Sequence, residues 1–379
     1  MFTTKSPQIF TISKMKQLPN EMMNDEKLWL ELKPILQVSR LFGLAPVSLK
    51  NSKWTFSKIG LLYSALCFAF YNYIFIDRIL IYIKEDWEIK LLILYVTIVV
   101  TTGSCVIMDF INCLLGYKKL QAYLNNIRRF DLSMKSRYCK SSDMLIKLYW
   151  RVLIGILIFL LPISVLTYKV DQKPILGAFT YFMFCAVLMI GILKFLAFTM
   201  IIFIRFREFN SKLTEDVTFV VEAKEKNKKL NWHGLWKKHK YLIEASKKLN
   251  SKYSLQLLLW FSVLSLNSIL QIYEFLKGDH KIIENIREML LALFFILLLT
   301  ALATICHFTA DEAKQMASIL SSPEYCQECN FQDQQIVFSL GQYFQFNDFN
   351  FSACNFFNIN LAVLLKIASA IITYLVILM

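Results

Sequence analysis

Seven long apolar stretches restrict the fold of this chain more than any other feature of its sequence. They cover residues 56–76, 89–115, 148–168, 175–204, 253–276, 286–308 and 356–379. A helix needs about 20 mostly apolar residues to cross the hydrocarbon core of a bilayer. Apolar residues make up 56% of the chain and charged residues 18%, a proportion that one water-soluble core could not bury. We therefore predict an all-α membrane protein with seven transmembrane helices.

Basic residues are divided unequally between the two sides that these spans define. The N-terminal segment and the second, fourth and sixth loops hold 31 Lys and Arg residues, whereas the first, third and fifth loops hold 8. Because basic loops stay on the cytoplasmic side, this bias predicts a cytosolic N-terminus and an extracellular C-terminus. A G-protein-coupled receptor has the opposite orientation. The same loops explain the net charge of +14, so no nucleic-acid partner is expected.

The sequence lacks the motifs of the common enzyme classes. GxSxG, HExxH, the P-loop and GxGxxG are all absent, so we expect neither an enzyme nor a cofactor. Cys326 and Cys329 form a CxxC pair, but their surroundings do not match a standard zinc pattern. We therefore predict two free cytosolic thiols and no metal. The first 50 residues hold no apolar leader, so the first span is expected to act as its own insertion signal.

A charge inside a membrane span is costly in lipid, and the charged residues within the predicted spans include Asp109, Arg151, Lys194 and Lys366. Asp109, Arg151 and Lys194 fall near the cytosolic ends of their spans. A pair between Asp109 and Arg151 is one reading, and Lys194 is expected to extend its ammonium group to the cytosolic interface. Lys366 lies in the last span together with several hydroxyl and amide side chains. Such a polar stripe is typical either of a water-lining helix or of a helix hydrogen-bonded within a bundle.

Aromatic side chains and a few hydrogen-bonding groups gather toward the outer ends of several spans. Aromatic walls with a few polar groups are typical of small-molecule pockets. The alternative reading is an interfacial aromatic belt with polar contacts between helices. The candidate ligand-pocket residues are Tyr95, Tyr168, Tyr181, Phe184, Asn267, Gln271 and Tyr273.

The end of the chain resembles the last membrane helix of the insect gustatory receptor family. The family signature is Thr-Tyr, five hydrophobic residues and Gln-Phe, and here Thr373 and Tyr374 are followed by five apolar residues. Residues 205–213, 249–257 and 306–313 resemble the family segments after span four, before span five and after span six. The inverted seven-span topology, deduced above from the loops, also matches this family.

The resemblance implies a multi-pass plasma-membrane receptor that assembles as a tetrameric, ligand-gated, non-selective cation channel. The last helix of each subunit would line one central pore. The implied ligand is a small-molecule tastant, with a bitter or plant-derived compound favoured over a sugar. Membrane lipid and related receptor subunits, in a homo- or hetero-tetramer, are the other expected partners. The pore and gate residues implied by the family are Ser369, Ile372, Thr373, Tyr374, Val376 and Ile377.

Two features depart from the family pattern. The sequence stops at Met379, so the Gln-Phe pair is missing, and we expect a truncated sequence, a gate built otherwise or a chain that does not conduct alone. Lys366 would disfavour cations at the pore axis, so it is expected to face the inner vestibule or a neighbouring helix. The alternatives are an odorant receptor of the same superfamily and a small-molecule transporter. Ten glycines and no internal repeat weigh against the transporter.

Four regions follow from these predictions. Residues 1–55 form a cytosolic N-terminal segment, and residues 56–308 hold six transmembrane helices with long basic cytosolic loops. Residues 309–352 form a cytosolic loop and anchor helix, and residues 353–379 form the pore-lining helix. The fourth loop is rich in Lys and Glu, which predicts that helices four and five continue into the cytosol as charged stalks.

Overall fold

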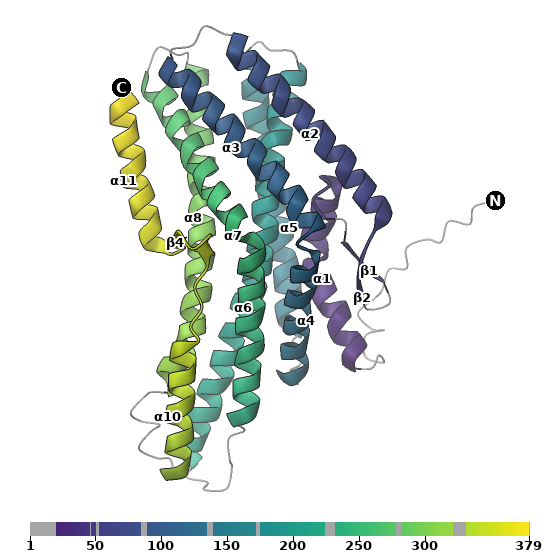
Figure 1. The fold of residues 1–379 in the computed structure, drawn as a ribbon, viewed down its shortest axis with the longest axis vertical. Helices are drawn as coiled ribbons and strands as arrows, with labels where there is room; N and C mark the ends of the chain where they lie inside the picture. Colours follow the sequence, from purple (N-terminus) through teal and green to yellow (C-terminus); the bar gives the residue numbers. More distant parts are fainter. Residues whose placement is uncertain are drawn as a thin grey trace, which may run out of the picture.

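The chain folds into an elongated bundle of long helices (Figure 1). The computed structural model describes residues 20–45, 47–50, 53–84, 89–134, 139–171, 175–223, 232–277, 282–320 and 331–378. The helices are α1 (Asn20–Leu41), α2 (Lys58–Lys84), α3 (Ile89–Leu114), α4 (Tyr117–Met134), α5 (Cys139–Asp171), α6 (Ile175–Ala223), α7 (Trp232–Lys277), α8 (Ile282–Leu320), α10 (Phe331–Phe346) and α11 (Leu361–Leu378). Two antiparallel hairpins pair β1 (Val47–Lys50) with β2 (Lys53–Phe56), and β3 (Ser352–Ala353) with β4 (Phe357–Asn358).

Seven of these helices are long and apolar enough to cross a membrane, which confirms the predicted number of spans. The candidate spans are Lys58–Ile76, Leu91–Leu114, Ile146–Thr167, Cys185–Glu215, Trp232–Lys277, Ile282–Leu320 and Leu361–Leu378. Figure 1 places the end of α11, the end of α2 and the start of α3 at the same end of the bundle, whereas α10 lies at the opposite end. Helices α6 and α7 continue without a break well past the length of one membrane crossing, as the stalk prediction required.

Two described helices were not predicted. Helix α1 precedes the first span, and helix α4 lies between the second and third spans. Helix α1 buries the apolar row Leu28, Leu32 and Ile35, whose spacing of three and four residues places them on one helix face. Helix α4 buries Tyr123 and Phe130 among its apolar residues and exposes polar side chains on its other face. Both helices are amphipathic rather than uniformly apolar, so a search for membrane spans passes over them.

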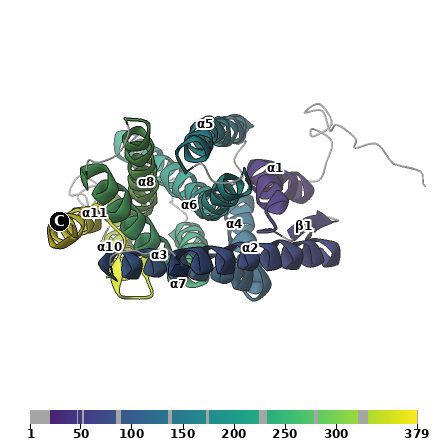
Figure 2. The ribbon, with the colours of Figure 1, turned by 90° about the horizontal axis from the view of Figure 1, so that it is seen from above.

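Helix α6 lies at the centre of the bundle, with α1, α4, α5 and α8 around it (Figure 2). Its membrane-spanning window is 78% buried, against 11% for α2 and 17% for α11. Tyr123 donates its hydroxyl hydrogen to the carbonyl of Phe198 at 2.9 Å, and Tyr149 donates to the carbonyl of Ala197 at 3.2 Å. Burial raises the pKa of the Tyr123 phenol well above its usual value, so the phenol keeps the proton that it donates.

An ion cluster joins three helices in the half of the bundle that contains α4. The Arg205 guanidinium on α6 donates to Glu31 of α1 at 2.8 Å and to Asp131 of α4 at 3.3 Å. Arg205 and Glu31 are both buried. A buried charge of this kind is tolerated only when it is paired and hydrogen-bonded. The cluster therefore fixes α1 and α4 against α6 in this half of the bundle.

Candidate functional site

The segment between α10 and α11 is fixed to the bundle and sets the starting point of α11. Asn250 of α7 accepts from the backbone N–H of Ser352 at 3.1 Å and donates to its hydroxyl at 3.2 Å. The Phe351 ring is fully buried and lies edge-on to Phe195 at 5.8 Å between centroids. Asn360 then caps the new helix, because its side-chain oxygen accepts from the N–H of Val363 at 3.1 Å.

The turn between β3 and β4 requires an unusual backbone. Cys354 and Asn355 have φ angles of 51° and 61°, in the left-handed region that L-residues seldom adopt. Phe357, directly after this turn, packs edge-on against Phe261 of α7 with ring centroids 5.7 Å apart. The turn thus reverses the chain between the buried Phe351 and the half-buried Phe357, so that α11 starts against α7.

Helix α11 has one packed face and one open face. Ile371 and Leu375 are 8% exposed and cluster with Leu91, Ile269 and Tyr273 of α3 and α7. The six residues implied as pore and gate are all exposed in the single subunit. The values for the four large ones are Ile372 63%, Tyr374 58%, Val376 72% and Ile377 61%. The chain therefore presents all six of these residues on a surface that it does not cover itself.

Lys366 lies on the open side of α11 and is exposed. It is three residues before Ser369 and seven before Thr373, a spacing that puts all three on one helix face. Thr373 donates its hydroxyl hydrogen to the Ser369 carbonyl at 2.9 Å. Ile371 is two residues from both Ser369 and Thr373, which directs it to the nearly opposite, packed side.

A second polar cluster lies inside the bundle and corrects two sequence-based interpretations. The Lys194 ammonium is 3.8 Å from Oδ1 of Asp109 and donates to the Leu44 carbonyl at 3.0 Å. Lys194 is 5% exposed and Asp109 1%, so Lys194 does not extend to an interface. Arg151 is exposed on α5, and the pairing of Asp109 with Arg151 is wrong. Helix α6 provides the nearer cation because it packs against α3.

Gln256 of α7 completes this cluster. Its amide nitrogen donates to Oδ2 of Asp109 at 3.1 Å and to the Cys105 carbonyl at 3.1 Å, while its oxygen accepts from Asn112 at 3.3 Å. A Cβ added at Gly191 of α6 would come within 2.7 Å of Oδ2 of Asp109. The glycine thus leaves the space in which the carboxylate lies between α3, α6 and α7.

The described ligand candidates form two groups, which lie on two different sides of α7. Tyr95 of α3 donates to the Glu274 carboxylate at 3.1 Å and packs on the cluster that contains Tyr273. Gln271 is two residues before Tyr273 and so points to another side of α7. Gln271 is 7% exposed, and within the described part of the chain its side-chain oxygen has no hydrogen-bond partner. Asn267, one helical turn before Gln271, donates to the Val263 carbonyl of its own helix at 2.8 Å.

Three further ligand candidates, Tyr168, Tyr181 and Phe184, have side chains outside the described part of the structure. Their backbone belongs to α5 and α6. The CxxC pair, Cys326 and Cys329, also lies outside the described residues. Within the described ranges, no group of three or more His, Cys, Asp or Glu side chains is arranged to hold a metal ion.

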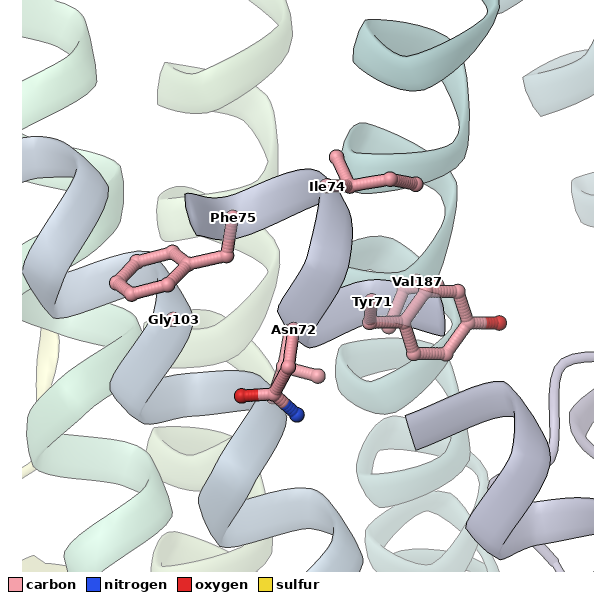
Figure 3. Close-up of a pocket in the computed structure, with 7 residues that line it drawn as sticks. Tyr71, Asn72, Ile74, Phe75, Gly103 and Val187 are labelled. Carbon is pink, nitrogen blue, oxygen red and sulfur yellow. The ribbon is translucent and has the colours of Figure 1, made fainter. Parts of the chain in front are cut away.

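One cavity lies between α2, α3 and α6, away from the predicted ligand residues (Figure 3). Its volume of about 10 Å³ is the space of roughly one water molecule. The Phe75 ring lies over Gly103, where a Cβ would come within 2.2 Å of the ring. The cavity is lined by Tyr71, Asn72, Ile74, Phe75, Gly103, Val106 and Val187. It is too small for an organic ligand.

The fold and the terminal helix define a multi-pass α-helical membrane protein with seven spans. The profile of the 7tm Chemosensory receptor family matches residues 32–379, and the chain belongs to this family, which confirms the predicted receptor superfamily and plasma-membrane location. The chain also resembles the solved olfactory receptor OR5 of the insect Machilis hrabei, with 15% identity and a TM-score of 0.69, over 94% of this chain and 99% of that one.

The structure of the same receptor in complex with eugenol gives the same identity and TM-score and covers 95% of this chain. No curated protein matches the sequence at a significant level. A likeness at this identity carries the fold, whereas the roles of individual side chains depend on their own geometry.

Sequence reasoning missed several residues that organise the site. Gln256, Asn250 and Arg205 each connect elements that are far apart in the sequence. The available signal was a polar side chain within or beside an apolar helix, because such groups need a partner in lipid. That signal marks the residue, but it does not identify the partner.

Proposed function

We propose that the chain is a subunit of a tetrameric, ligand-gated cation channel in which one α11 from each subunit lines a central ion path. The observation that carries this proposal is the open face of α11, where Lys366, Ser369 and Thr373 form a polar row on an otherwise apolar helix. Polar rows of this kind are costly against lipid and favourable along water. A single α11 at the edge of a subunit cannot enclose a path, so the proposal requires several copies around one axis.

Helix α10 supports assembly at the opposite end of the subunit from the end of α11. Phe338 is 65% exposed and Phe346 83% exposed. The one charged residue of this helix is Asp333, and large exposed aromatic side chains on a helix with so little charge are typical of protein interfaces. We propose that residues 309–352 form the cytosolic anchor that holds subunits together, followed by the pore helix over residues 353–379.

The proposed ligand is a small, mostly apolar molecule bound near the outer ends of the helices, on the side of α7 that carries Asn267 and Gln271. Its further candidate contacts are Tyr168, Tyr181 and Phe184 of α5 and α6. The other two candidates, Tyr95 and Tyr273, lie on the side of α7 that packs against α11. Gln271 supports this site because its buried oxygen has no donor among the described residues. An unsatisfied buried acceptor costs about 1–3 kcal/mol, which a ligand with one N–H or O–H group would recover. A bitter or plant-derived compound fits these neutral and aromatic surroundings better than a sugar.

Helix α7 would connect this site to the pore. Tyr273 and Ile269 of α7 pack directly against Ile371 and Leu375 of α11. A ligand that binds one arrangement of α7 more tightly than another would shift α11 toward the matching state, by no more than its differential affinity for the two states. The coupling therefore needs no contact between the ligand and α11.

Taste reception is the finer assignment that we propose, because Thr373 and Tyr374 stand where the gustatory signature has them. Odour reception is the second candidate, favoured by the likeness in fold to an olfactory receptor. A panel that contains both involatile bitter compounds and volatile odorants separates the two. Responses confined to volatile compounds would contradict the gustatory assignment.

The orientation that we propose has a cytosolic N-terminus and an extracellular C-terminus, as the distribution of basic residues indicates. Epitope tags at each end, stained in intact and in permeabilised cells, test it. The C-terminal tag should stain in intact cells and the N-terminal tag only after permeabilisation. The reverse pattern would refute the orientation.

The channel activity is tested by two-electrode recording from oocytes that express the chain, with a panel of bitter compounds, sugars and odorants including eugenol. Thr373→Trp places a bulky ring on the open face of α11 and should abolish the evoked current. Leu161→Trp is the matched control, since Leu161 is 55% exposed and belongs to α5, a helix that lies away from α11 (Figure 2). Equal currents from the two variants would refute the assignment of α11 to the ion path.

A further inference from the structure

We propose that Lys366 is a selectivity-determining residue, whose four copies form a ring of positive charge near the inner mouth of the pore and weaken its preference for cations. The inference rests on the proposed tetrameric channel. It adds a site at which permeating anions would be attracted, and a reason why the channel would discriminate weakly between cations and anions. Neither follows from the fold alone.

The position of Lys366 along α11 sets the depth of this ring. Lys366 is the sixth residue of α11, which begins at Leu361, so it lies about 7.5 Å along the helix axis from the first residue. The α11 start is held by Asn250 and the buried Phe351, which fixes this depth in every subunit. The ring would stand one to two turns inside the start of the pore helix.

The direction of Lys366 follows from the two faces of α11. The packed face is occupied by contacts of Ile371 and Leu375 with α3 and α7, and Lys366 shares the other face with Ser369 and Thr373. The exposed charge of α2 offers a comparison, because Lys58 is the first residue of that helix, where an ammonium group reaches the membrane surface easily. Lys366 instead lies within α11, on the side that carries Ser369 and Thr373. This placement favours water and other copies of the chain over lipid.

The ammonium group of Lys366 is not neutralised by a neighbour. Within the described residues, no ion pair or hydrogen bond joins Lys366 to another side chain, and α11 itself contains no Asp or Glu. Asp348, the acidic residue of the segment before α11, lies 4.0 Å from Lys314 instead. Four unpaired ammonium groups around one axis would therefore raise the local electrostatic potential for every ion that passes.

The physical consequence is a change in the ratio of cation to anion permeability. Removal of four charges that act across water should raise this ratio by about threefold to tenfold, and charge reversal should raise it further. Because screening lengths shorten with salt, the effect should shrink as ionic strength rises. Loss of an unrelated basic residue should leave the ratio unchanged.

The test uses the full chain, purified and reconstituted in planar bilayers with a KCl gradient, recorded without ligand and with eugenol as the probe. Reversal potentials are compared for the natural chain, Lys366→Gln and Lys366→Glu. Arg151→Gln is the matched control, because it removes an exposed basic residue from α5, on another side of the bundle. We expect the natural chain and Arg151→Gln to share one reversal potential. The reversal potential of Lys366→Gln should lie closer to the K⁺ equilibrium potential, and that of Lys366→Glu closer still.

The two proposals fail differently. Currents with one reversal potential for all four proteins would overturn the selectivity role of Lys366 and leave the channel intact. No current from the natural chain in either condition would refute the channel, and the ring with it.

In native membranes, a bismaleimide should link Lys366→Cys between subunits. It should not link Ala368→Cys, which is exposed on the side of α11 nearer its packed face. Failure of Lys366→Cys to link would overturn the axial placement.

Discussion

The ion pair between Asp109 and Lys194 provides the sharpest test of how the bundle is held together. Lys194→Met keeps the length of the side chain and removes its charge. Asp109 would then keep only the amide of Gln256 as a donor, and the Leu44 carbonyl would lose its 3.0 Å bond to Lys194. Removal of one partner from a buried pair costs about 3–5 kcal/mol. We expect a loss of stability of that order.

The double variant Asp109→Asn/Lys194→Met separates the pair from its surroundings. An Asn at position 109 can still accept from Gln256 and carries no carboxylate charge that Lys194 would have to balance. The double variant should therefore be less destabilised than the sum of the two single variants by about 1–3 kcal/mol, the usual range for groups in one network.

Thermal unfolding in detergent, followed by size-exclusion chromatography with fluorescence detection, gives the four midpoints of this cycle. Arg151→Met is the control, since Arg151 is exposed, and should shift the midpoint little. Strictly additive effects of the two single variants would refute the coupling between Asp109 and Lys194. A large effect of Arg151→Met would indicate that the charge of Arg151, and not that of Lys194, supports the fold.

Three further substitutions test other contacts, each by the same unfolding assay. Gly103→Ala forces a Cβ into the Phe75 ring and should lower the free energy of unfolding by about 1–3 kcal/mol. Adding Phe75→Leu should restore part of this stability. An unchanged stability of Gly103→Ala would refute the close packing of α2 on α3. Asn250→Ala removes two hydrogen bonds to the segment before α11 and should lower the free energy of unfolding by about 1–3 kcal/mol. Proteolysis of that segment should become faster, and an unchanged proteolysis rate would contradict the role of Asn250. Tyr123→Phe should cost about 0.5–1.5 kcal/mol, and a stabilised variant would contradict the bond to α6.

The sequence predicted the membrane helices well because one physical rule governs them. A span must be long and apolar, and both properties can be read from consecutive residues. Helices α1 and α4 follow a different rule, because they bury one face against protein and expose the other. Their apolar residues, such as Leu28 and Leu32, recur at helical spacing within polar segments, and only a search for that period would predict them.

Partners across the bundle could not be predicted in the same way. Asp109 and Arg151 both occur near the cytosolic ends of their spans, but the sequence does not say which helices are neighbours. In the fold, α6 lies against α3, and Lys194 therefore reaches Asp109. Likewise Gln271 and Tyr273 looked like members of one pocket, yet a spacing of two residues turns them to different sides of α7.

The central claim is that the open face of α11 lines an ion path, and cysteine modification tests it most directly. In oocytes that express Thr373→Cys, a charged methanethiosulfonate reagent applied during a ligand-evoked current should change that current irreversibly. The natural chain, which has the same native cysteines, should be unaffected. An unchanged current from Thr373→Cys, together with proof that the thiol was modified, would contradict the claim.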